Sequence, residues 1–179
     1  MRLGLTPAAG GAFCAASTRS GSLENSIDIG SAVPPFSLLV EGGNISPASL
    51  NRSWYILYFY PKDDTTGCTQ QAQDFSKLRS QLDAAGVALF GVSKDSLASH
   101  QRFASKHNLS INLASDPETL AAQAFGVWVE KSMYGRKYMG MERSTFLVDN
   151  LGIVRHIWRK VRVPGHAEEV LNHVLRLKP

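Results

Sequence analysis

Hydrophobic residues along this chain follow two patterns, short continuous apolar runs and longer stretches with helical spacing. Continuous runs rich in aromatic and β-branched residues predict strands buried in a sheet. Stretches in which apolar residues recur every three or four positions predict amphipathic helices. The expected strands are 36–40, 54–60, 87–92, 112–114, 145–148 and 153–158, and the expected helices are 68–86, 97–107, 116–125 and 165–177.

Turn residues connect these elements in a recognisable order. Glu41-Gly42-Gly43-Asn44 predicts a β-hairpin near the N-terminus, and Asp149-Asn150-Leu151-Gly152 predicts a second one near the C-terminus. Strands alternating with helices, followed by a hairpin and a last helix, imply a central mixed β-sheet flanked by helices. We therefore expect an α/β, thioredoxin-like fold with an N-terminal β-hairpin, formed by one domain over residues 27–179.

Residues 1–26 differ in composition from that domain. They are rich in Ala, Gly, Ser and Thr and show no apolar periodicity, which is typical of a disordered extension. A cleaved organelle-targeting peptide is the alternative, because the segment contains arginine and serine while residues 1–23 contain no Asp or Glu. We expect a cytoplasmic protein, or one of the mitochondrion or plastid if the extension is a transit peptide.

Composition excludes several classes of function. The formal net charge is only +4, and no basic stripe interleaved with aromatic residues predicts nucleic-acid binding. No apolar run reaches the roughly 18 residues of a membrane span. The two cysteines, Cys14 and Cys68, are too few for a disulfide scaffold and favour a reducing compartment with a free thiol.

Cys68 is the candidate for chemistry. The apolar run 54–60 stops at Pro61, a short polar loop follows, and Cys68 comes at the start of the next helix. Unpaired backbone N–H groups and the helix dipole favour negative charge there, and a thiolate is the reactive form of cysteine. An inert buried cysteine is the plainer alternative, but Gly67 and the helix start favour a nucleophile.

The segment around Cys68 resembles the active site of a known family. Pro61-x-x-x-Thr65-x-x-Cys68 is similar to the signature of the peroxiredoxins, and its flanking residues resemble the bacterioferritin comigratory protein or peroxiredoxin Q subfamily. The resemblance covers residues 30–177. It continues through Phe125–Trp128, Glu130–Gly135, Glu142–Asp149 and Val163–His166.

The resemblance implies a thiol peroxidase that reduces hydrogen peroxide and organic hydroperoxides without metal, flavin or haem. Cys68 would be the peroxidatic nucleophile and become a sulfenic acid. Thr65 would direct its hydroxyl to the thiolate and the peroxide, although by position alone it suits a helix N-cap. Arg143, expected on a strand, would stabilise thiolate and peroxide, and Pro61 would shape the loop and shield the sulfur. Read without the resemblance, Arg143 is a surface charge and Pro61 a strand terminator.

Two departures from the subfamily pattern bear on recycling. Thr66 stands where a proline is common, and Gln73 stands where many members carry a resolving cysteine. We therefore expect one-cysteine behaviour, with thioredoxin, glutaredoxin or glutathione as external reductant, in a monomer or weak homodimer. The rivals are a thiol–disulfide oxidoreductase, disfavoured because Cys68 opens no C-x-x-C motif, and a redox sensor that oxidises without turnover.

Overall fold

The computed structural model describes residues 27–178, which form one seven-stranded sheet, a separate two-stranded hairpin and four helices. The sheet strands are β1 (Leu38–Val40), β2 (Gly43–Ile45), β3 (Trp54–Phe59), β4 (Val87–Ser93), β5 (Asn112–Ser115), β8 (Ser144–Val148) and β9 (Val154–Trp158). The helices are α1 (Thr66–Ala84), α2 (Leu97–His107), α3 (Leu120–Ala124) and α4 (His166–Leu177). The segment 1–26 lies outside the described residues, so the prediction of a disordered or targeting extension there is not tested.

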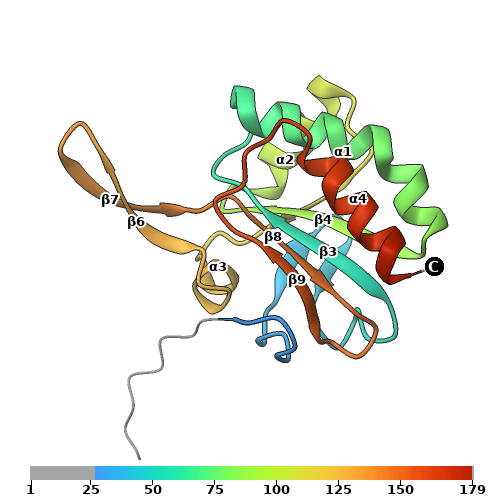
Figure 1. Cartoon of the computed structure of the whole chain (residues 1–179). Coiled ribbons are helices and arrows are strands. Elements are labelled where there is room, and N and C mark those ends of the chain that lie inside the picture. Colours follow the sequence, from blue (N-terminus) through green and yellow to red (C-terminus); the bar gives the residue numbers. More distant parts are fainter. Residues whose placement is uncertain (1–26, 179) are drawn as a thin grey trace, which may run out of the picture.

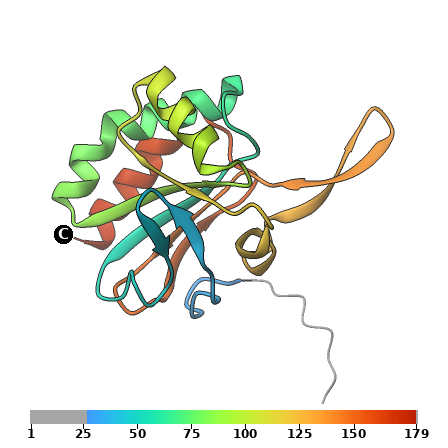
Figure 2. The same ribbon diagram turned by 180° about the vertical axis from the view of Figure 1, so that it is seen from behind.

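The sheet is mixed, as the sequence predicts. Its strand order is β2-β1-β5-β4-β3-β8-β9, with β3, β4 and β5 parallel and β8 antiparallel to β3. The β1–β2 hairpin expected near the N-terminus joins the sheet at β5. Three helices, α1, α2 and α4, cover one face of the sheet, while α3 lies against the other (Figures 1 and 2).

Strand β3 shows why the sheet needs cover on both faces. Its side chains alternate, so that Ile56 and Tyr58 pack under α1 and α4 whereas Leu57 and Phe59 pack toward α3. All four are almost fully buried. The continuous apolar run of the sequence is therefore explained by two separate cores, one on each side of the same strand.

Helix boundaries mostly agree with the capping residues in the sequence. Gly86 follows the end of α1 with a φ of 67°, and the Ser96 side chain accepts a hydrogen bond from the N–H of Ser99 at the start of α2. The prediction for 116–125 was wrong at its N-terminus, because α3 begins only at Leu120. Thr119, with a φ of 58°, interrupts the helical backbone, and Asp116 caps the helix from a distance through the N–H of Ala122.

A third hairpin was missed by the sequence analysis. Strands β6 (Trp128–Met133) and β7 (Arg136–Met141) pair only with each other and project from the body of the protein (Figure 1). The prediction that Arg143 lies on a strand was also wrong, since it occupies the short break between β7 and β8. Within residues 27–178, no helix combines the length and the apolar character needed to cross a bilayer.

Candidate active site

Cys68 is the third residue of α1, in the turn where backbone N–H groups have no partner inside the helix. The first helical bond of this end runs from the N–H of Thr69 to the carbonyl of Thr65. The N–H groups of residues 66–68 therefore precede the hydrogen-bonded ladder and leave the positive end of the helix dipole beside the sulfur. The Cys68 side chain is buried, with only 2% of the residue exposed.

Arg143 makes the decisive contact with this sulfur. Its Nη2 donates to Cys68 Sγ at 3.3 Å, across a separation of 75 residues in the sequence. Gly67 lies directly beside the guanidinium, since a Cβ added there would be 3.4 Å from Nη2. The backbone of Arg143 is fixed as well, because its carbonyl accepts the N–H of Val161 at 2.8 Å. The site thus pairs a thiol at a helix start with a positioned cation.

Gln71 is a functional candidate that the sequence analysis missed. Its Oε1 accepts a hydrogen bond from Arg143 Nη1 at 2.5 Å, so that the guanidinium bridges Gln71 and Cys68. Gln71 is 1% exposed, yet its Nε2 has no hydrogen-bond partner among the described residues. The sequence did hold a signal for Gln71, because it is a polar residue one turn after Cys68 on the apolar face that also carries Ala72 and Phe75.

The loop between β3 and α1 is anchored by Asp63. One oxygen of its carboxylate accepts from the Tyr60 hydroxyl at 2.6 Å, and the other meets Ser99 Oγ and His100 Nδ1, both at 2.8 Å. Burial opposes ionisation, but the hydrogen bonds from His100 and Tyr60 outweigh it and lower the pKa of Asp63. The other ring nitrogen of His100 lies 3.2 Å from the carbonyl of Ala114. The active-site loop is therefore tied to α2 and β5.

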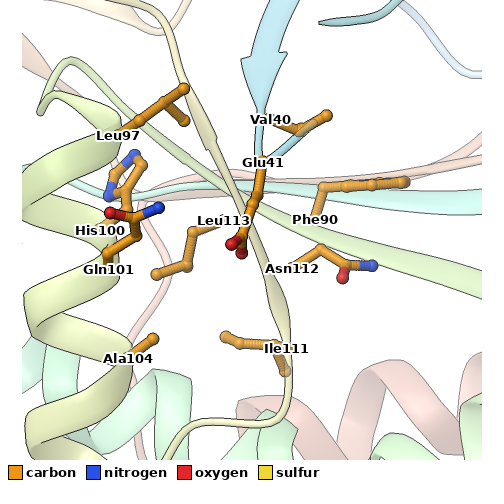
Figure 3. Close-up of a pocket in the computed structure, with 10 residues that line it drawn as sticks. All are labelled: Val40, Glu41, Phe90, Leu97, His100, Gln101, Ala104, Ile111, Asn112 and Leu113. Atoms are coloured by element: carbon orange, nitrogen blue, oxygen red, sulfur yellow. The ribbon is translucent and has the colours of Figure 1, made fainter. Parts of the chain in front are cut away.

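His100 also borders a cavity. Its ring projects from α2 at one side of this space (Figure 3), which has a volume of about 270 Å³ and is also lined by residues of β1, β4 and β5. Glu41 reaches toward the middle of this space (Figure 3). Cys68 does not line the cavity, and His100 connects it to the active-site loop through Asp63.

Asp64 forms a second anchor at the surface. It accepts from Lys106 Nζ and contacts His107 Nε2, each at 2.6 Å, and both residues lie at the end of α2. The Lys106 hydrogen bond, followed by that of His107, lowers the pKa of Asp64. Asp64 has a φ of 60°, a left-handed conformation that aspartate tolerates better than most residues. Two consecutive aspartates thus attach the same loop to one helix.

The structure places Thr65 and Pro61 in the same loop without showing the contacts expected of them. Thr65 occupies the N-cap position of α1, but its side chain makes no capping hydrogen bond. Its hydroxyl donates instead to the carbonyl of Lys62 at 3.2 Å. Pro61 is half-buried directly after the β3 run. Of the four residues singled out in the sequence, Cys68 and Arg143 are in direct contact.

Comparisons with known proteins identify the family. The AhpC/TSA family model matches residues 29–157. Peroxiredoxin Bcp of Bacillus subtilis is 43% identical over 146 residues, which cover 81% of this chain and 93% of the relative. A structure of the Xanthomonas campestris bacterioferritin comigratory protein superposes with a TM-score of 0.78 at 38% identity, covering 86% of this chain and 98% of the other.

A structure of Xylella fastidiosa PrxQ superposes similarly, with a TM-score of 0.80 at 35% identity and coverage of 86% and 98% of the two chains. These similarities extend over nearly the whole domain and confirm the thioredoxin-like fold. The chain belongs to the AhpC/TSA family and, within it, to the bacterioferritin comigratory protein or PrxQ peroxiredoxins, which are thiol-dependent peroxidases.

Proposed function

We propose that Cys68 is the peroxidatic nucleophile of this peroxidase. The observation that carries the proposal is the 3.3 Å contact between Arg143 Nη2 and Cys68 Sγ at the start of α1. A cation and a helix N-terminus both favour the thiolate over the thiol. The same guanidinium can hydrogen-bond a peroxide oxygen as negative charge develops on it during attack.

The reaction transfers one oxygen to sulfur. The Cys68 thiolate attacks one oxygen of the peroxide, a S–O bond forms and the O–O bond breaks. The leaving oxygen takes the electron pair and, after protonation, departs as water or an alcohol, while Cys68 becomes a sulfenic acid. In this scheme Thr65 turns its hydroxyl from Lys62 toward the reacting atoms, and Pro61 limits access of water to the sulfur.

We infer that both hydrogen peroxide and organic hydroperoxides are substrates. Support comes from the X. campestris relative, for which alkyl peroxide reduction activity is described. It also comes from the apolar residues that surround the sulfur, because Tyr58, Ala72 and Phe75 belong to the same core cluster as Cys68. An apolar surrounding suits an organic peroxide as well as it suits a small neutral one.

Recycling is proposed to follow a one-cysteine route. Gln73 cannot resolve a sulfenic acid, and Cys14 lies outside the described residues. An external thiol such as thioredoxin, glutaredoxin or glutathione would then attack Cys68 directly. Such a route needs a reducing compartment, for which we propose the cytoplasm, and it operates in a monomer or weak homodimer.

Two variants test these assignments. Cys68→Ser is expected to abolish turnover while thermal unfolding stays close to that of the native protein. Cys14→Ser is expected to keep nearly full thiol-dependent turnover, with dimedone trapping the Cys68 sulfenic acid after peroxide treatment. A Cys14–Cys68 disulfide peptide in the oxidised native protein, together with loss of turnover in Cys14→Ser, contradicts the one-cysteine route. Oxidation that occurs once and then stalls with every thiol identifies a redox sensor.

A further inference from the structure

Arg143 faces a cavity on the side of the site formed by the β6–β7 hairpin. The space has a volume of about 570 Å³ and is bounded by the base of the hairpin, the break before β8 and the loop after β9. Figure 1 shows these three segments meeting where the hairpin leaves the body of the protein. The lining residues are Val129, Glu130, Lys131, Glu142, Arg143, Lys160 and Val161.

The cations that line this cavity lack carboxylate partners. Both of its carboxylates are already paired with cations outside the lining, Glu130 with Lys137 at 3.1 Å and Glu142 with Arg159 at 2.8 Å. The three lining cations, Lys131, Arg143 and Lys160, form no ion pair with any residue in the range 27–178.

Lys131 is held in this lining by a hydrogen bond to the backbone. Its Nζ donates to the carbonyl of Met141 at 2.5 Å, which holds the ammonium at the base of the hairpin. Burial and then the nearby Arg143 guanidinium lower the pKa of Lys131, and the opposing effects of Glu142 and Cys68 do not cancel them. An anion bound between Lys131 and Arg143 would remove this repulsion.

Lys160 is held beside the same space at a conformational cost. Its φ is 48°, in the left-handed region that a lysine rarely adopts. The next residue, Val161, donates its N–H to the carbonyl of Arg143 at 2.8 Å, so the loop is fixed against the active-site arginine. Strained backbone at a non-glycine residue is found preferentially at functional sites.

We propose that this cavity binds the carboxylates of an anionic low-molecular-weight thiol, of which glutathione is the type, and so positions the thiol that reduces Cys68. This rests on the one-cysteine route proposed above. The volume lies within the roughly 300–1,000 Å³ of small-molecule sites. Lys131 and Lys160 would hold carboxylates, while Val129 and Val161 contact the apolar parts of the thiol.

The chemistry has two steps, a condensation of the sulfenic acid with a thiol and then a thiol–disulfide exchange. The bound thiolate attacks Sγ of the Cys68 sulfenic acid, a S–S bond forms, and the S–O bond breaks to release hydroxide, which is protonated to water. A second thiol then attacks the mixed disulfide on the sulfur of the bound thiol. This step releases the symmetrical disulfide and returns Cys68 to the thiolate, so two thiols are oxidised for each peroxide reduced.

The test compares glutathione with its diethyl ester, which has the same nucleophile but neither carboxylate charge. Turnover efficiency of the native enzyme is expected to be higher with glutathione than with the ester. Lys160→Asn removes the charge with a residue that tolerates left-handed backbone, and it should lower the ratio of the two efficiencies about fivefold, as for loss of one ion pair near the surface. Lys160→Glu should lower the ratio further.

Lys77→Asn is the matched control, because Lys77 is an exposed lysine on α1 that does not line this cavity; it should leave the ratio unchanged. Equal efficiencies with glutathione and the ester, or an equal loss for both in Lys160→Asn, would overturn the anion site. Turnover with a thioredoxin system and none with glutathione would overturn it too, in favour of a protein reductant. Failure of peroxide to oxidise Cys68 in a single turnover refutes the proposed function itself.

Discussion

Replacing Gln71 by methionine separates the positioning of Arg143 from the stability of the fold. Methionine has a similar volume, keeps the buried face of α1 filled and offers Arg143 Nη1 only a weak sulfur acceptor in place of the amide oxygen. Hydrogen bonds to charged groups contribute about 1.5–3 kcal/mol. Because Nη2 still reaches Cys68 and the Arg143 backbone remains bonded to Val161, we take the lower end, which corresponds to about a tenfold slower reaction with peroxide.

The free energy of unfolding of Gln71→Met should stay the same or rise, although the reaction slows. The native Gln71 Nε2 is buried without a partner among the described residues, and such a group costs roughly 1–3 kcal/mol. Methionine removes that unsatisfied donor. The expected signature is therefore a slower enzyme that resists urea at least as well as the native protein.

The assay is stopped-flow measurement of the second-order rate constant for Cys68 oxidation, with urea unfolding on the same samples. Gln70→Met is the control, since Gln70 is the exposed neighbour whose side chain bonds, among residues 27–178, only Asp74 on the same helix. A rate for Gln71→Met within twofold of both the native protein and the control would refute the positioning role. A slow variant that is also markedly destabilised would show that Gln71 acts through the fold.

Three further predictions follow from the same geometry. Arg143→Ala should slow peroxide reduction by roughly ten- to a hundredfold and reduce the thiolate absorbance in the far ultraviolet, because a charged hydrogen bond to sulfur is lost. An unchanged rate and absorbance would show that Arg143 is only a surface charge. His100→Leu should cost about 3 kcal/mol in urea unfolding, since it removes one donor from the buried Asp63. His107→Ala, at the exposed Asp64, should cost much less, and equal losses would contradict the argument. Burial lowers the pKa of His166 to about 4, below the 6.5 of an unfolded histidine. Its contribution to stability is therefore present above pH 6.5 and is lost as the pH falls toward 4, a loss of up to about 3 kcal/mol. His166→Gln should flatten the dependence of unfolding free energy on pH between 6.5 and 4, and an unaltered dependence would show that other groups cause it.

The sheet could be predicted from the sequence because its strands are buried on both faces. Continuous runs such as 54–60 identify a strand without reference to the rest of the chain. The β6–β7 hairpin gave no such signal, because it projects from the body and packs on no second layer. Most of its residues, among them Arg136 and Lys137, are exposed, and polar exposed segments are hard to tell from loops in a sequence.

The candidate site could be predicted where its features are neighbours in the sequence, and not where they depend on contacts between residues far apart in the sequence. Cys68 stands out because its helix start lies next to it in the sequence. Arg143 was recognised only by resemblance, since nothing in its neighbourhood indicates a contact 75 residues away. The pairing of Asp63 with His100 was not foreseen for the same reason, as it joins a loop to a helix through tertiary packing alone.

The anchored loop bears directly on how recycling is achieved. Asp63 and Asp64 attach the segment before α1 to α2, and Gln71 holds the first turn of α1 to Arg143. A resolving cysteine at position 73 would lie on this same helix and would require its first turns to unwind before a disulfide could close. With Gln73 in that position, unwinding would break the contact of Cys68 with Arg143, and the helix itself offers no second thiol. The one-cysteine route that we propose therefore requires an external thiol to reach the buried Cys68 from the side of Arg143.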